Sequence, residues 1–156
     1  MTLAEARRAV RDGGDFGALL AFVPYAEWLG LRLHQRDAQA PVLRLPYREA
    51  LVGNPRLPAL HGGVVAGFME SAALLQLLLV LEQDRVPKSI DFSIDYLRSA
   101  RPEDSYAACE LTRLGRRVAQ VQVRCWQSEA TKPVALARAH FLLAPEANAT
   151  AEHLQA

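Results

Sequence analysis

An apolar run over residues 62–81 contains a single formal charge, that of Glu70. Its length and its lack of alternation predict a helix that is apolar on nearly all sides and therefore buried. A membrane span needs about 20 mostly uncharged residues, and a carboxylate at the bilayer centre is costly, so a buried core helix is the better interpretation. We expect Pro87, in the polar segment 84–88 that follows, to end this helix.

Six segments show the alternation of apolar and polar residues that is typical of β-strands. They are "LRLHQRD" (31–37), "PVLRLPYRE" (41–49), "SIDFSIDYL" (89–97), "SYAACELTR" (105–113), "VAQVQVRCW" (118–126) and "VALARAHFLL" (134–143). The last four are predicted to form an antiparallel meander. In the third segment the alternation places Ile90, Phe92, Ile94 and Tyr96 on one face, and Ser89 with the aspartates on the other. Residues 50–59 are predicted to be a loop because they contain glycine and two prolines.

Short helices are predicted before the first strand. Thr2 and Glu5 have the spacing of a capping box for a helix over residues 3–11. A second piece over residues 15–22 follows a Gly-Gly break, and Pro24 can start a third helical turn. We expect one domain over residues 1–156, with a helical segment at about 1–24, a core at about 25–144 and a frayed tail over 145–156.

The order of these elements predicts the fold class. A long apolar helix must be covered, and six strands curling around it would cover it. The sequence therefore predicts an α+β fold, in which a curved six-stranded antiparallel sheet wraps around one long central helix.

Composition narrows the class of protein. Apolar residues make up 51% of the chain, charged residues 22%, and the formal net charge is +1. The basic residues are scattered, so no nucleic-acid partner is expected. The N-terminus lacks the apolar stretch of a signal peptide, so we expect a cytoplasmic protein without membrane insertion.

The two cysteines lie on neighbouring predicted strands. Matching the apolar faces around a three-residue loop, with Gly115 at positive φ, places Cys109 opposite Val121 and Cys125 opposite Ser105. The sulfurs would then be offset by about 13 Å along the strands, too far for a disulfide. Two buried thiols in a reducing compartment are expected.

The apolar helix opens with His61, Gly62 and Gly63. Backbone N–H groups at a helix N-terminus can hold a carbonyl oxygen that becomes an oxyanion, and glycines leave room for it. The alternative is that the glycines only allow close packing, and that His61 is a capping or packed histidine. The four histidines have no metal-ligand spacing, so no metal and no cofactor are expected.

Glu70 is the second candidate for chemistry. An unpaired carboxylate on an otherwise apolar helix costs several kcal/mol to bury, so its presence indicates a functional site. The alternative is that Glu70 faces solvent through a gap in the sheet or pairs with an arginine.

Four segments together resemble the hot-dog-fold acyl-CoA thioesterases of the phenylacetyl-CoA (PaaI-like) type. They are "LHGGVVAGFMESAA", "SIDFSIDYLRSARPED", "LTRLGRRVAQVQVRCW" and "ALARAHFLL", and the likeness covers residues 25–143. The resemblance implies an acyl-CoA substrate, with coenzyme A as part of the substrate. It also implies a homodimer that often doubles to a homotetramer, with an active site between protomers.

The resemblance also implies roles for individual residues. Gly62 would donate its N–H to the thioester carbonyl, and Glu70 would be the nucleophile or the general base. Ser89 matches a position where a hydroxyl orients water. The family's usual amide and glycine are replaced by Pro55 and Pro58, and Asn54 is the residue that could stand in for the amide. The groups expected to bind coenzyme A are Gly63, Arg98, Arg113, Gly115, Arg116 and Arg117.

Two other functions stay open. A non-catalytic acyl-CoA-binding or regulatory hot-dog protein would explain Pro55 and Pro58. A hot-dog dehydratase acting on hydroxyacyl thioesters would use His61 together with Glu70.

Overall fold

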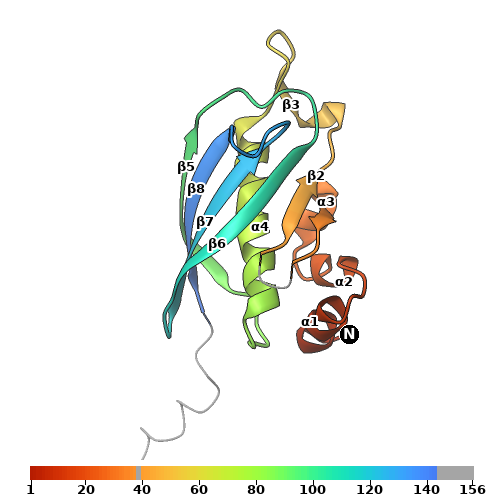
Figure 1. Ribbon diagram of the computed structural model, residues 1–156, viewed down its shortest axis with the longest axis vertical. Coiled ribbons are helices and arrows are strands. Elements are labelled where there is room, and N and C mark those ends of the chain that lie inside the picture. The colour runs from red at the N-terminus through yellow and green to blue at the C-terminus, as the bar shows by residue number, and fades with distance from the viewer. Residues whose placement is uncertain (38–39, 144–156) are drawn as a thin grey trace, which may run out of the picture.

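The computed structural model describes residues 1–37 and 40–143. Six antiparallel strands form one sheet, and the long helix α4 (Gly62–Val80) packs against it (Figure 1). In spatial order the strands are β1 (Arg32–Gln35), β2 (Val42–Leu45), β6 (Ser105–Leu114), β7 (Val118–Trp126), β8 (Ala135–Leu142) and β5 (Lys88–Tyr96). The predicted α+β class, with a six-stranded antiparallel sheet on one long helix, is confirmed.

The expected four-strand meander is wrong for β5. Strand β6 pairs with β2 on one side and with β7 on the other, which leaves no free edge beside it for β5. Strand β5 instead pairs with β8 at the far edge of the sheet. The connection from β5 to β6 crosses the end of the sheet (Figure 1). As a result, β5 has one neighbouring strand among the described residues and presents a free edge.

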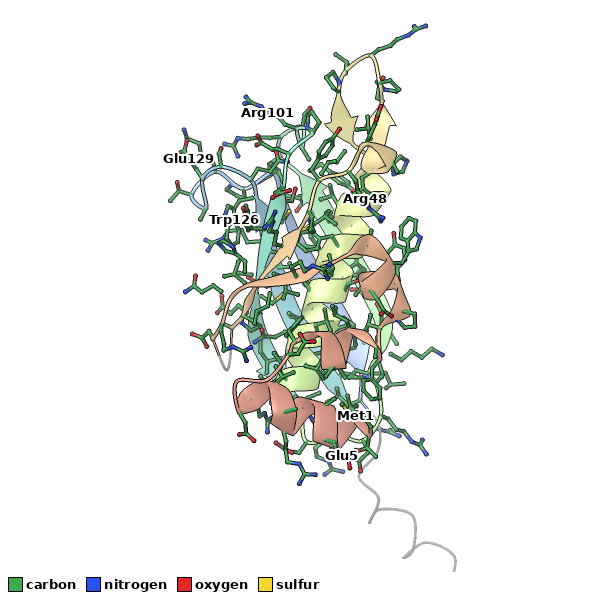
Figure 2. The ribbon with its side chains drawn as sticks, turned by 90° about the vertical axis from the view of Figure 1, so that its right-hand side faces the viewer. Met1, Glu5, Arg48, Arg101, Trp126 and Glu129 are labelled. Atoms are coloured by element: carbon green, nitrogen blue, oxygen red, sulfur yellow. The ribbon has the colours of Figure 1, made fainter. Side chains whose placement is uncertain are left out.

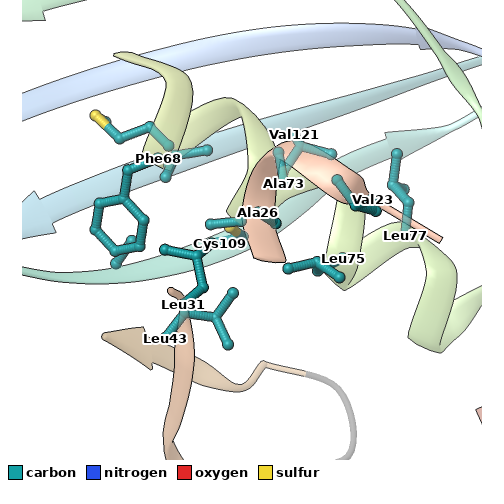
Figure 3. Close-up of a cluster of buried hydrophobic side chains, with 14 of the residues drawn as sticks. Val23, Ala26, Leu31, Leu43, Phe68, Ala73, Leu75, Leu77, Cys109 and Val121 are labelled. Carbon is teal, nitrogen blue, oxygen red and sulfur yellow. The ribbon is translucent and has the colours of Figure 1, made fainter. Parts of the chain in front are cut away.

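Short helices precede the sheet as predicted. Helix α1 (Leu3–Arg11) begins with the Thr2–Glu5 capping box, and α2 spans Gly17–Leu20. Helix α3 (Pro24–Leu29) starts at a proline and ends at Gly30, whose φ of 74° favours glycine. Buried side chains of these helices join the core around α4 and the sheet (Figure 3).

Helix α4 ends at Val80, well before Pro87, so the expected helix end is wrong. Two arginines of α1 bind its last carbonyls instead. Arg7 Nε donates to the Leu78 oxygen at 2.8 Å, and Arg11 Nε donates to the Leu79 oxygen at 2.9 Å. These donors satisfy carbonyls that a helix C-terminus leaves unpaired, and they fix α1 to the end of α4.

Residues 50–59 are not a simple loop, contrary to the prediction. A 3-10 turn (Glu49–Leu51) leads into a small hairpin of β3 (Val52–Asn54) and β4 (Ala59–Leu60). The hairpin projects beyond the end of the sheet (Figure 1). The predicted tail over residues 145–156 lies outside the described residues.

The hairpin of β6 and β7 has a different register from the predicted one. Cys109 lies opposite Val123, and Cys125 lies opposite Ala107, a shift of two residues. A bulge at Thr112 and a turn over residues 115–118 cause the shift, and Gly115 does not have positive φ. A shift of two preserves the apolar faces.

The thiols of both cysteines are free and buried. Burial raises the pKa of each thiol to about 12, because the apolar core destabilises the thiolate. At neutral pH both side chains therefore behave as small apolar core residues.

A bulge also changes the faces of β5. Ser89 pairs with Phe141 and Asp91 with His140, so Ile90 is an extra residue without a partner. Ser89 therefore lies on the inner face of the sheet with Phe92, contrary to the strict alternation that was predicted. Ile90 is exposed at the free edge.

Candidate active site

The start of α4 leaves one backbone donor free. His61 is the N-cap, and its Nδ1 accepts a hydrogen bond from the Gly63 N–H at 2.9 Å. The Gly62 N–H has no hydrogen-bond partner among the described residues. This donor lies at the positive end of a 19-residue helix, where a developing negative charge is stabilised.

Tyr96 holds the Gly62 peptide in place, a role that the sequence did not indicate. Its hydroxyl donates to the Gly62 carbonyl oxygen at 2.7 Å. A Cβ added at Gly62 would lie 3.3 Å from Cζ and the hydroxyl oxygen of Tyr96, so even one methyl group makes this contact tight. The alternation of β5 places Tyr96 on the inner face, but only the folded chain brings it to the helix start.

A cavity of about 410 Å³ opens beside Gly62. Its walls include Gly62, Val65, Tyr96, Arg98 and Val134. The cavity therefore combines apolar side chains, a cation and the start of α4. Such a mixture suits a ligand with an apolar part and an anionic part.

Glu70 lies on a stripe of α4 that the sheet does not cover. The stripe consists of Gly63, Ala66, Gly67, Glu70 and Leu74, which recur at helical spacing and are all exposed or half-buried. Glu70 is itself half-buried, and its carboxylate makes no hydrogen bond or ion pair among the residues that the structure describes. Its carboxylate is therefore free to meet a substrate or a second chain.

Gly62 and Glu70 of one chain do not reach the same carbonyl group. Eight residues of helix separate them, which is about 12 Å along the axis at 1.5 Å per residue. A nucleophile and an oxyanion donor must both lie about 3 Å from the reacting group. The two methylenes of a glutamate do not close that gap, so a site that uses both residues needs them from different chains.

The other predicted site residues fall into separate places. Ser89 lies at the opposite end of β5 from Tyr96 and faces inward. The Asn54 side-chain oxygen accepts from the N–H groups of Arg56, at 3.0 Å, and Leu57, at 3.4 Å. The oxygen of its amide is thereby engaged in the hairpin turn, which also contains Pro55 and Pro58.

The arginines expected to bind coenzyme A also separate. Arg98 lines the cavity beside Gly62 and donates to the Pro133 oxygen at 2.7 Å. Arg113, Gly115, Arg116 and Arg117 lie at the turn between β6 and β7, at the opposite end of α4 (Figure 1). These turn residues can approach the Gly62 cavity only from a second copy of the chain.

A larger cavity, of about 700 Å³, lies near the C-terminal end of α4. Its walls include Arg11, Gln76, Val80, Cys109 and Leu111. Gln76 Oε1 is buried there without a hydrogen-bond partner in the described part of the chain. This cavity contains no helix N-terminus, and its cysteine is a neutral thiol. The backbone donor that thioester cleavage needs lies in the cavity beside Gly62 instead.

Within residues 1–37 and 40–143, no group of three histidine, cysteine or acidic side chains is placed to hold a metal ion. Helix α4 is long and apolar enough to cross a membrane by composition, but 61% of that stretch is buried inside the protein. Its burial marks it as the core helix of a globular domain.

Comparisons with known proteins agree with this architecture. The family model described as "Thioesterase superfamily" matches residues 57–134. The medium/long-chain acyl-CoA thioesterase YigI of Escherichia coli K12 is 28% identical over 120 residues, covering 69% of this chain and 77% of YigI.

Solved structures extend the comparison to most of the chain. A protein from Chromobacterium violaceum has 38% identity and a TM-score of 0.71, covering 90% of this chain and 97% of the other. A putative thioesterase from Ralstonia eutropha, a phenylacetic acid degradation-related protein, has 22% identity and a TM-score of 0.69. That match covers 77% of this chain and 89% of the other, and it supports the fold.

The six-stranded antiparallel sheet packed on one long helix is the hot-dog fold, and the matches to thioesterases place the chain in the class of thioester hydrolases. This chain belongs to the thioesterase superfamily.

Proposed function

We propose that this protein hydrolyses an acyl-CoA thioester to the free acid and coenzyme A, in an active site made by two copies of the chain. Gly62 of one copy donates its N–H to the thioester carbonyl, and Glu70 of the other copy activates the attack. The free Gly62 N–H beside a cavity, on a helix fixed by Tyr96, is the observation that carries this proposal.

The reaction needs one donor and one carboxylate. As general base, Glu70 takes a proton from water while the water oxygen attacks the carbonyl carbon. As nucleophile, its carboxylate attacks directly and forms an anhydride that water then hydrolyses. In both routes the carbonyl oxygen becomes an oxyanion at the Gly62 N–H. Collapse of the tetrahedral intermediate then breaks the C–S bond and releases the coenzyme A thiolate. In the general-base route the thiolate takes up the proton that Glu70 removed from water, and in the nucleophile route it takes up a proton from solvent.

Ser89 supports this arrangement through its place on the inner face of β5. Its hydroxyl is half-buried and, like Glu70, lies away from Gly62 of the same chain. In the shared site we assign it the orientation of the attacking water. His61 caps α4 through Nδ1 and positions the Gly62 and Gly63 peptides, rather than acting as a base.

Thiol release tests the proposal directly. We expect the protein to release coenzyme A from at least one member of a series of short, medium, long and aromatic acyl-CoAs. Free thiol is followed with a chromogenic disulfide reagent. The Gly62→Val variant serves as a control, because its side chain would crowd Tyr96 at the start of α4, where the oxyanion donor lies. Absence of release from every member of the series would overturn the proposed hydrolysis.

We expect the protein to be a dimer or a tetramer in solution. Strand β5 has nine residues and a free edge, and the α4 stripe around Glu70 is partly open to solvent. An unpaired edge and an open apolar face are liabilities for a monomer. Light scattering at micromolar concentration should give two or four times 17.2 kDa. A mass of one chain would exclude a shared site.

Non-catalytic binding of acyl-CoA is a second candidate, and the position of Asn54 favours it. Its amide oxygen accepts two hydrogen bonds within the hairpin turn, so this oxygen is engaged there rather than in positioning water. Calorimetry distinguishes the two functions, because a binding protein would take up acyl-CoA without releasing thiol.

A further inference from the structure

Two aromatic side chains of α3 and one arginine from the segment before the 3-10 turn form an exposed row of planar groups. The rings of Tyr25 and Trp28 are stacked, with centroids 5.7 Å apart and an interplanar angle of 15°. The Arg48 guanidinium lies 5.0 Å from the Trp28 ring centroid. We call Tyr25, Trp28 and Arg48 the aromatic platform. Tyr25 is 47% exposed and Trp28 is 61% exposed, so two stacked aromatic rings lie side by side at the surface, and aromatic side chains of this kind are enriched at binding surfaces.

The aromatic platform adjoins the candidate active site at two points. At one point, Tyr25 packs on Gly67 of the α4 stripe, where an added Cβ would lie only 2.7 Å from Tyr25 Cε1. Gly67 lies one helical turn after Gly63 and nearly one turn before Glu70. The absence of a side chain at Gly67 is therefore what allows the platform to contact α4.

The second point is the start of α4. The Arg48 oxygen accepts from the Leu51 N–H at 3.0 Å, and the Leu51 oxygen accepts from the His61 N–H at 2.9 Å. Arg48 is thus fixed, through one 3-10 turn, to the N-cap of α4. Figure 2 shows Arg48 beside the N-terminal half of this helix.

The chemistry of the platform suits a nucleotide. Arg48 donates one hydrogen bond, to the Trp28 oxygen at 2.8 Å, and makes no ion pair among the described residues. The neighbouring Glu27 and Glu49 do not pair with it. Its charge is free to bind a phosphate, which arginine recognises well. The indole of Trp28 stays 61% exposed beside Tyr25 and Arg48, and a purine base can stack on the part of its π-system that they leave open.

We propose that the aromatic platform binds the nucleotide end of coenzyme A, with the adenine ring against Trp28 and a phosphate on Arg48. The inference rests on the proposed function, because an acyl-CoA in the active site would bring a nucleotide to this face of α4. The flexible pantetheine arm separates the adenine from the thioester, so the nucleotide needs a subsite away from Gly62. Trp28 and Arg48 are binding residues in this scheme, and neither touches the reacting atoms.

Two substrates with the same acyl group test this subsite: the acyl-CoA, and the acyl-pantetheine that lacks the nucleotide. In Trp28→Ala the KM for acyl-CoA should rise about ten-fold, the scale of one lost base–aromatic contact. Its kcat for acyl-CoA, and both constants for acyl-pantetheine, should stay unchanged. Arg48→Ala should also raise the KM for acyl-CoA alone, and the KM of wild type should increase with salt.

Trp126 provides the matched control. Trp126 stacks with Tyr106, and Arg124 lies 5.5 Å from its ring centroid. The sheet therefore carries a second group of one tyrosine, one tryptophan and one arginine. Figure 2 shows Trp126 and Arg48 on opposite sides of the molecule. Trp126→Ala should leave all four kinetic constants unchanged.

Binding of adenosine 3′,5′-bisphosphate, measured by calorimetry, tests the platform without hydrolysis. Wild type and Trp126→Ala should bind it, and Trp28→Ala should bind it about ten-fold more weakly. If wild type binds it but releases no thiol from any acyl-CoA, the proposed hydrolysis fails and the nucleotide subsite stands.

Three outcomes would overturn the subsite. One is an equal rise in KM for acyl-CoA and acyl-pantetheine in Trp28→Ala, and another is no binding of the bisphosphate by wild type. The third is a change of mass in light scattering for Trp28→Ala, which would show that a second copy of the chain covers the platform.

Discussion

Replacement of Glu70 by glutamine should lower kcat for acyl-CoA hydrolysis by at least about 100-fold, the lower end of what general acid–base catalysis contributes. Glutamine keeps the size of the side chain but neither accepts a proton from water nor attacks the carbonyl carbon. The free energy of unfolding should stay the same or rise, because the substitution removes from α4 a half-buried carboxylate that has no partner among the described residues. Thiol release and urea denaturation, followed on the same preparation, measure the two effects.

Glu129→Gln is the matched control for this variant. Glu129 pairs with Lys132 at 3.2 Å on the exposed connection between β7 and β8, so its loss should change neither turnover nor stability appreciably. Unchanged turnover in Glu70→Gln would remove Glu70 from the mechanism. A loss of oligomerisation with little change per active site would assign Glu70 a structural role instead.

A mixed dimer of Gly62→Val and Glu70→Ala chains should regain about half of the wild-type activity, although each variant alone is inactive. The two residues are separated by about 12 Å along α4, so each site takes one of them from each chain. In the mixed dimer one site receives both defects and the other receives neither. The intact site then has both the oxyanion donor and the carboxylate that the reaction needs. Two affinity tags allow purification of the mixed dimer, and thiol release measures its activity.

The reverse pairing is the control. A chain that carries both substitutions, combined with a wild-type chain, puts one defect into each site, so this dimer should be inactive. If the double-variant dimer is active and the first mixed dimer is not, then Gly62 and Glu70 act within one chain. In that case the protein can still be a thioesterase, but the shared site is excluded.

Gly62→Val acts by a mechanism that the structure makes specific. An added Cβ lies 3.3 Å from Tyr96, whose hydroxyl holds the Gly62 carbonyl. The branched side chain must displace either the phenol or the start of α4. The first change breaks the hydrogen bond that holds the Gly62 carbonyl, and the second moves the N–H itself, so we expect the substitution to disturb the oxyanion donor without removing a reactive side chain.

The sequence alone determined the elements whose cause is local. The capping box at Thr2 and Glu5 set the start of α1, and Pro24 began α3 as expected. The apolar run with one carboxylate identified α4 as a core helix, and the alternation of β6 and β7 gave their faces correctly. These signals depend on residues a few positions apart, so they act before the chain folds.

Only the tertiary structure decided where those elements meet. Three features depend on contacts between residues far apart in the chain. They are the position of β5 at the edge of the sheet, the binding of the last α4 carbonyls by Arg7 and Arg11, and the contact of Tyr96 with Gly62. Bulges at Ile90 and Thr112 reset registers that strict alternation had fixed differently. Alternation encodes the face of a strand but not its partner, because pairing depends on which distant segments pack together and on turn geometry. The number of residues between Gly62 and Glu70 on one helix could be read from the sequence. The exposure and the hydrogen-bond partners of these two residues could not. The free N–H of Gly62 and the open stripe around Glu70 exist only in the packed domain.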